Sequence, residues 1–286
     1  MSGDMFRQLF DDASLFPPAA LAMSEAVTAH QRHQEAWYRD TSGPFVCADT
    51  KIRELSAALT AAGVAELDLA LVLPGGAAGL QAAVDAVSAD PRLRLRAIEL
   101  PIAASADTAS AVSEVAAALD RAPLAGASAF IEVPARQLTA DVARAVADHR
   151  YLAKVRTGGI TAEAFPDEPT LATCITNLAA ERLPFKCTAG LHHAVRHTAP
   201  DSGFEHHGFL NVLLAVAAAL TAERIEEVRA QLADSAASRV AAKVSELDDE
   251  TVLAVRDLFT SFGTCSTDEP IEDLVTLGLI GADRDS

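Results

Sequence analysis

The sequence predicts an α/β protein with one domain, a (β/α)8 TIM-type barrel preceded by an N-terminal helical extension. Short apolar or β-branched runs alternate with longer alanine- and leucine-rich segments of helical period, which is typical of strand-helix units in a parallel sheet. Eight such runs can be counted. The chain has 286 residues, enough for one barrel of about 250 residues, and it shows no linker between two smaller domains.

The predicted elements follow one another in order. Six strands are clear, at residues 44–49, 67–74, 93–102, 128–134, 151–157 and 184–189. Two are less clear: residues 207–214 could equally start a buried helix, and residues 260–266 follow a helix at 248–258. Further helices are expected at residues 51–62, 77–88, 108–120, 139–149, 168–181 and 222–232, and a last one begins near Asp268. We therefore divide the chain into an extension of residues 1–43, containing a helix at 19–39 and packing on the barrel, and a barrel of residues 44–286.

An open, doubly wound sheet is the alternative architecture. Such a sheet often carries a G-x-G-x-x-G turn after its first strand, where it binds a dinucleotide. The sequence has no such turn, and Pro74-Gly75-Gly76 has the wrong spacing for it. The barrel is therefore favoured.

Composition excludes several classes of protein. Half of the residues are hydrophobic, and 40 acidic residues outnumber 23 basic ones to give a net charge of −17. An acidic chain without a basic run is a poor partner for nucleic acid or an anionic membrane. The longest apolar stretch, 212–220, is too short to span a bilayer, and the beginning of the sequence does not have the shape of a signal peptide. We expect a cytoplasmic protein.

Four cysteines lie far apart in the sequence, and none belongs to a C-x-x-C pair. This spacing indicates neither a disulfide framework nor a thiolate zinc site. We expect all four to be reduced residues of the core.

Polar side chains at the carboxyl ends of barrel strands are the first candidates for chemistry, because barrel enzymes build their active sites there. Side chains two apart on a strand share a face, so Lys154 and Arg156 point the same way, as do Lys186 and Thr188. If that face is the interior, cations and carboxylates converge near the mouth. The candidates are Asp49, Glu99, Glu132, Lys154, Arg156, Lys186 and Thr188.

Three interpretations of this cluster are open. The charges form a structural network, with Glu99 and Glu132 neutralising Lys154 and Arg156. Alternatively, an ammonium group crowded by other cations has a lowered pKa and becomes an amine nucleophile or base. In the third interpretation, the cluster binds an anion without covalent chemistry.

The sequences at two strand ends resemble those of a known class of barrel enzymes. Lys154-Val-Arg-Thr-Gly-Gly159 and Lys186-Cys-Thr-Ala-Gly190 resemble the lysine-then-Thr/Ser-Gly strand ends of class I aldolase barrels such as deoxyribose-phosphate aldolase. In that family, paired lysines on adjacent strands divide the roles of Schiff-base former and pKa perturber, and the loops that follow bind a phosphate. The resemblance implies the first role for Lys154 and the second for Lys186, and it covers these two stretches only.

Five of the eight histidines fall within 16 residues downstream of Lys186. This density predicts acid-base chemistry or metal ligation. We assign His192 to proton transfer and His193 to substrate contact. The alternative is a divalent metal site, which would use His192, His193 and His197 with Glu99 or Glu132.

Two further segments carry candidate residues for the site. Gly158 and Gly159 follow a strand, and their free backbone N–H groups are candidates for holding a substrate anion. In the extension, Asp11 and Asp12 stand among apolar anchors, which predicts a cap over one barrel end or a direct contribution to the site.

The sequence thus predicts a lyase or aldolase-type enzyme that uses an active-site lysine, without a cofactor, on a small anionic carbonyl or carboxylate compound. Lys154 would be the nucleophile or base. Arg156 and Lys186 would bind the substrate anion, and Glu132 or His192 would relay protons. The alternatives are a metal-dependent hydrolase or isomerase and a non-catalytic barrel that binds a metabolite or a partner. Composition also suggests a homodimer.

Overall fold

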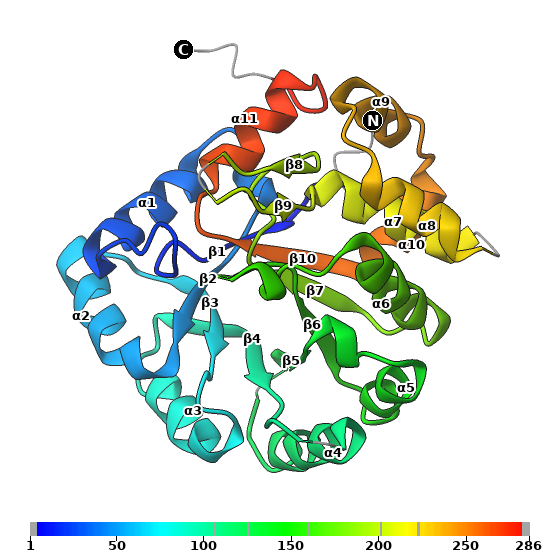
Figure 1. Ribbon diagram of the computed structural model, residues 1–286. Coiled ribbons are helices and arrows are strands. Elements are labelled where there is room, and N and C mark those ends of the chain that lie inside the picture. The colour runs from blue at the N-terminus through cyan, green and yellow to red at the C-terminus, as the bar shows by residue number, and fades with distance from the viewer. Residues whose placement is uncertain are drawn as a thin grey trace.

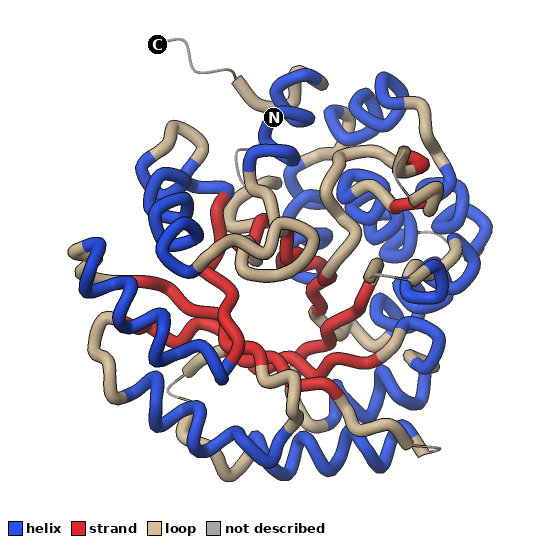
Figure 2. Tube along the Cα trace, turned by 60° about the vertical axis from the view of Figure 1, so that its left-hand side comes forward, coloured by secondary structure: helices blue, strands red, loops and turns tan. Residues whose placement is uncertain are grey.

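The computed structural model describes residues 5–105, 107–124, 126–159, 161–200, 202–221 and 224–281. In this part of the chain, eight parallel strands close into a barrel in the order β1-β10-β7-β6-β5-β4-β3-β2. The helices form a ring outside the strands (Figures 1 and 2). The predicted (β/α)8 barrel is confirmed. The strands are β1 (Phe10–Asp12), β2 (Ser42–Ala48), β3 (Leu67–Val72), β4 (Leu93–Pro101), β5 (Ser128–Val133), β6 (Leu152–Arg156), β7 (Phe185–Thr188) and β10 (Phe259–Thr264).

Four of the helices begin at a residue whose side chain caps the first turn. Side-chain oxygens of Asp107, Thr139, Asp167 and Asp248 accept hydrogen bonds from backbone N–H groups in the first turns of α4, α5, α6 and α10, which satisfies donors that would otherwise have no partner. The helices are α1 (Met23–Glu35), α2 (Ile52–Ala62), α3 (Leu80–Ser88), α4 (Thr108–Leu119), α5 (Ala140–Asp148), α6 (Glu168–Ala180), α7 (Phe209–Thr221), α8 (Ile225–Ala233), α9 (Ala237–Ser245), α10 (Asp249–Leu258) and α11 (Asp268–Thr276).

The structure places the first barrel strand earlier than predicted. β1 lies in residues 1–43, where we expected only an extension, and it pairs with both β2 and β10 to close the barrel. Three residues are too few to show a strand period. Helix α1 follows β1 as the helix of this first unit.

Residues 207–214, which we counted as a strand although they could equally start a buried helix, form the beginning of that helix. These residues belong largely to α7, which is buried along most of its length. A helix that is apolar on all sides shows no amphipathic period and resembles a buried strand. Between β7 and β10 the chain also forms a short hairpin of β8 (His197–Thr198) and β9 (Glu205–His206), which Figure 1 shows beside α11. The predicted helix at 222–232 starts at Ile225, and residues 222 and 223 lie outside the described residues.

Two hydrophobic clusters form the core. The larger lies between the strands and the helices, and the smaller consists of Val46, Ala70, Val72, Ala97 and Phe130. These five residues alternate along their strands with members of the larger cluster, so they face the barrel interior. The inward face thus carries several small side chains, which leave room there for long charged ones. All four cysteines are buried and free, as expected.

Among the described residues, no helix is both long enough and apolar enough to cross a bilayer.

Candidate active site

The strand register brings the two barrel lysines together. Lys154 on β6 is aligned with Lys186 on β7 and with Glu132 on β5. Glu99 on β4 is aligned with Phe130, which faces the interior. All four charged residues therefore point into the barrel, as the period of the strands predicts.

Lys186 is held deepest among the strands, with 2% of its side chain exposed. Its Nζ donates to Oε1 of Glu99 at 2.5 Å and to Oδ2 of Asp11, and it lies 5.4 Å from the centre of the Phe130 ring. Burial alone would lower the pKa of Lys186, but Asp11 and Glu99 outweigh burial and hold the pKa well above its ordinary value. Lys186 is therefore a permanent ammonium group.

Asp11 is the predicted extension residue that reaches the interior. Its Oδ2 accepts hydrogen bonds from Lys186 and from Ser261 on β10, the latter at 2.9 Å. Burial raises the pKa of Asp11, and the nearby Lys186 opposes this shift only in part. Its neighbour Asp12 instead pairs with His30 of α1 at 2.9 Å and fastens that helix to β1.

Lys154 is held between two carboxylates and has 4% of its side chain exposed. Its Nζ lies 2.6 Å from Oε2 of Glu99 and 2.9 Å from Oε2 of Glu132. Burial opposes ionisation of Glu99, but Lys154 and Lys186 outweigh it and lower the pKa of Glu99 to about 2. Glu99 is therefore ionised and bridges the two ammonium groups.

Arg156 ends this series of charges toward the carboxyl ends of the strands. Its guanidinium lies 3.2 Å from Oε1 of Glu132, and 48% of its side chain is exposed. Despite burial, Lys154 and Arg156 lower the pKa of Glu132. We call the set of Asp11, Lys186, Glu99, Lys154, Glu132 and Arg156 the charge chain. It contains three acids and three bases in alternation.

This alternation differs from the expected crowding of cations. Glu99 lies between the two ammonium groups, and Glu132 lies between Lys154 and Arg156. A buried charge is tolerated only when it is paired, so the carboxylates separate the cations. An amine at Lys154 would thus have to arise by proton transfer to a carboxylate and not by repulsion between cations.

The loops after β6 and β7 touch one another above the strands. Thr157 Oγ1 donates to the carbonyl of Ala189 at 2.6 Å. A Cβ on Gly158 would lie 2.7 Å from Cα of Gly190, so this contact requires glycine. Thr188 and Gly159 belong to the same region, with Thr188 at the end of β7 and Gly159 in the loop after β6. Asp49 lies in a turn after β2 and accepts from the N–H of Thr50.

The predicted histidines make their hydrogen bonds away from the charge chain. His192 Nδ1 lies 3.2 Å from Oε2 of Glu269, and His193 Nδ1 lies 3.2 Å from Oδ2 of Asp273; both acids belong to α11. His197 packs between His193 and His206. Within the described residues, no group of three or more His, Cys, Asp or Glu side chains is arranged to hold a metal ion. The structure therefore does not gather His192, His193 and His197 with Glu99 or Glu132 into a metal site.

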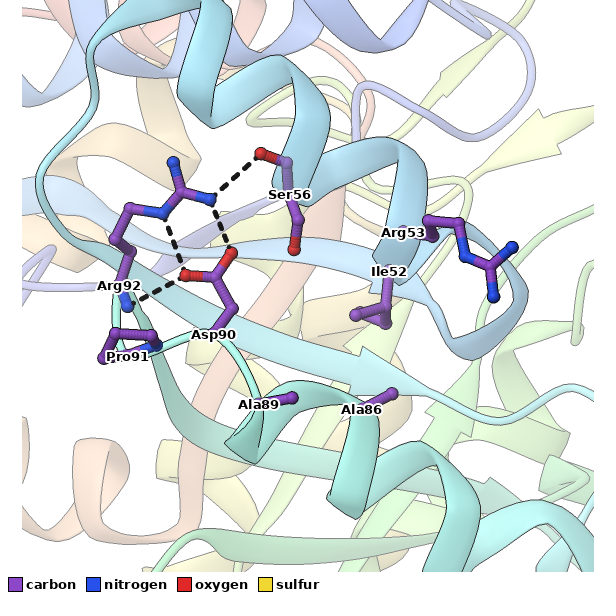
Figure 3. A pocket seen from close by; sticks show the side chains of 8 residues that line it. All are labelled: Ile52, Arg53, Ser56, Ala86, Ala89, Asp90, Pro91 and Arg92. Atoms are coloured by element: carbon purple, nitrogen blue, oxygen red, sulfur yellow. Dashed lines mark hydrogen bonds and ion pairs between the residues drawn. The ribbon is translucent and has the colours of Figure 1, made fainter.

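A hollow of about 550 Å³ lies on the outer surface between α2, α3 and the turn before β4, away from the barrel interior (Figure 3). Asp90 and Arg92 form an ion pair of 2.7 Å there, and Arg92 also donates to the carbonyl oxygen of Ser56 at 3.0 Å. The bonds of Arg92 to Asp90 and to Ser56 hold this helix-to-strand turn against α2. This hollow is not lined by any residue of the charge chain.

Comparison with known proteins gives no family for the chain. Neither a protein-family model nor a curated protein matches the sequence.

Proposed function

We propose that this TIM barrel is a lyase or aldolase-type enzyme, which uses Lys154 on a small anionic carbonyl or carboxylate compound. The observation that supports it is the position of Lys154, which is buried between two carboxylates. One of them, Glu132, also contacts the half-exposed Arg156. Barrel enzymes react at the carboxyl ends of their strands, which is the side to which Arg156 extends.

Arg156 is the anion-binding group of this proposal. A guanidinium has five N–H donors in a planar fork, and it binds carboxylate or phosphate through two of them. A substrate anion on Arg156 would neutralise the cation that helps to keep Glu132 ionised. Glu132 would then become a better base, 2.9 Å from Nζ of Lys154.

The covalent step follows from that contact. Glu132 accepts a proton from the Lys154 ammonium group, and the nitrogen lone pair forms a bond to the substrate carbonyl carbon as the C=O π bond breaks. The carbonyl oxygen takes up the second proton that the attacking nitrogen loses, which gives a neutral carbinolamine. Glu132 then returns its proton to the departing hydroxyl group, so that water leaves and an iminium ion remains. Glu99 keeps the charge on Lys186 balanced throughout and positions Lys154.

Reductive trapping tests the proposal. Incubation with a panel of small keto acids and aldehydes, followed by borohydride and peptide mapping, is expected to give an adduct on Lys154. Lys154→Arg is expected to fold, to retain anion affinity and to lose turnover by roughly 10³-fold or more, because arginine cannot supply a neutral amine. Lys243→Arg is the matched control, since Lys243 lies on α9 and pairs with Asp234. Turnover by Lys154→Arg at nearly the wild-type rate would refute the role of Lys154.

Non-covalent recognition is the second candidate. Each lysine of the charge chain is paired with two carboxylates, which favours a fixed electrostatic framework. In that case a carboxylate or phosphate ligand would bind to Arg156, no substrate would turn over, and no adduct would be trapped. Arg156→Gln would abolish binding.

Location and assembly remain predictions from the sequence. Cell fractionation tests the cytoplasmic location, and light scattering tests the homodimer; a monomer at micromolar concentration would refute the latter. The divalent-metal alternative is tested by elemental analysis together with activity in added zinc, manganese and magnesium.

A further inference from the structure

A second cavity opens at the opposite end of the barrel from Arg156. It has a volume of about 280 Å³, and it is lined by residues at or before the amino ends of strands, among them Arg7, Arg96, Ser128 and Arg256. Its lining also includes Lys186 and Asp11 of the charge chain. In TIM barrels this end ordinarily serves stability, so a cavity lined with charged residues there calls for an explanation.

The lining is strongly cationic. Arg7, Arg96, Arg256 and Lys186 line the cavity together with a single acid, Asp11, although the whole chain has a net charge of −17. Two of the four cations have carboxylate partners: Arg96 pairs with Asp68 at 3.0 Å, and Lys186 pairs within the charge chain. Among the described residues, neither Arg7 nor Arg256 has a carboxylate within 4 Å.

Arg256 is held in place by backbone carbonyl groups. Its guanidinium donates to the carbonyls of Phe259, Arg7 and Thr260 at 2.9, 2.9 and 2.7 Å. Three of its five N–H donors are thus used, and the other two have no acceptor in the part of the chain that the structure describes. Burial lowers the pKa of Arg256 to about 10, which still leaves the group charged at neutral pH.

The cavity carries more positive than negative charge around Arg256. The guanidinium is partly buried, and Asp11, the acid of the lining that acts on it, is already bonded to Lys186. A guanidinium already fixed by the backbone loses little conformational freedom on binding an anion. The cavity therefore has both the charge and the rigidity of an anion site.

We propose that the cavity at the amino end of the barrel binds a small oxyanion of the phosphate class, held by Arg256 with Arg7 and Arg96. With a volume of about 280 Å³, the cavity lies below the usual size of drug-like sites. This size favours a phosphate or a short phosphomonoester over a nucleotide. The evidence for this site does not depend on the chemistry proposed for Lys154.

Ser128 allows a test that leaves Arg256 and its backbone contacts in place. Ser128 lines the cavity, begins β5 and is exposed, so a longer side chain is accommodated at the rim. Ser128→Glu adds a negative charge to the cavity, while Ser128→Gln has nearly the same size without the charge. Titration calorimetry with inorganic phosphate at low ionic strength is done in the Arg156→Gln background, which removes the other proposed anion-binding group. It is expected to show saturable binding of one phosphate per chain both with Ser128 and with Ser128→Gln. We expect Ser128→Glu to bind roughly tenfold more weakly or worse, because like charges repel across a binding site.

Two arginine variants complete the design. Arg256→Gln in the same background is expected to lose binding, and Arg156→Gln alone, at the other end of the barrel, is expected to keep it. The proposal is overturned if Arg156→Gln shows no saturable phosphate binding up to millimolar concentrations. Equal affinity of Ser128→Glu and Ser128→Gln in that background would overturn it too.

Discussion

Glu99→Gln removes the charge on which both barrel lysines converge. The side chain keeps its shape, but one of its two oxygens becomes an NH2 group, which cannot accept a hydrogen bond. In the wild type, Glu99 accepts at 2.6 Å from Lys154 and at 2.5 Å from Lys186. The variant therefore loses at least one of these contacts and leaves the charge chain with one cation in excess.

The expected cost of Glu99→Gln follows from two arguments. Breaking a buried ion pair by neutralising one partner costs about 3–5 kcal/mol. Independently, the pKa of Glu99 is about 2 in the folded protein and 4.5 ordinarily, a difference that corresponds to about 3 kcal/mol at neutral pH. A loss of about 3 kcal/mol lowers Tm by roughly 6–12 °C in a protein of comparable size.

Urea unfolding at pH 7, followed by circular dichroism, measures this cost. The matched control is Glu66→Gln, which removes an exposed carboxylate beside Arg94 and is expected to cost less than about 1 kcal/mol. Because the folded pKa of Glu99 is lowered, its stabilisation is present above pH 4.5 and is lost as the pH falls toward 2. The difference between wild type and Glu99→Gln is thus expected to shrink in acid. If the free energy of unfolding of Glu99→Gln lay within about 1 kcal/mol of the wild-type value at pH 7, the stabilisation assigned to Glu99 would be refuted.

Two further predictions concern the loops around the carboxyl end of the barrel. Burial, reinforced by nearby His197, lowers the pKa of His206 to about 4; the neutral form is thus favoured in the fold, and its stabilisation is present above pH 6.5 and is lost as the pH falls toward 4. We expect His206→Phe to weaken the pH dependence of the urea midpoint across that range, and an unchanged slope would contradict this origin. Gly158→Ala is expected to destabilise by about 1–3 kcal/mol because its Cβ would meet the backbone of Gly190, whereas Gly75→Ala, with open space around it, is expected to be nearly neutral. Equal melting temperatures of the two alanine variants would contradict the close contact.

The alternation of strands and helices was sufficient to predict the barrel, because each unit combines a short strand-like run with a longer segment of helical period. The first strand was not predictable in the same way. β1 has three residues, and its partners β10 and β2 come from opposite ends of the chain, so no local pattern announces it. The predicted strand at 207–214 and the unrecognised β1 offset each other, and the predicted number of eight strands was therefore correct although two assignments differed.

The charge chain was largely predictable, since alternation along a strand fixes which side chains share a face. Lys154, Lys186 and Glu132 come together because their strands are aligned residue by residue. The order of the contacts was not predictable, because side-chain partners depend on burial and on reach. The cavity at the amino end was missed as well: Arg256 belongs to a helical pattern, and no local feature indicates that its guanidinium turns toward the barrel.

The alternating charges explain why both anion sites proposed here lie at the ends of the barrel. Within the charge chain each ammonium group lies between two carboxylates, so its charge is already balanced and an incoming anion gains little there. Arg156 has one carboxylate partner and is half exposed, and Arg256 is fixed by backbone carbonyls at the other end. We therefore expect an anion to bind most favourably at the two ends, where a guanidinium has N–H donors that are not paired with a carboxylate. Lys186 and Glu99 connect the cavity beside Arg256 to Lys154, so occupancy of one end changes the electrostatic surroundings of the lysine on which the proposed chemistry depends.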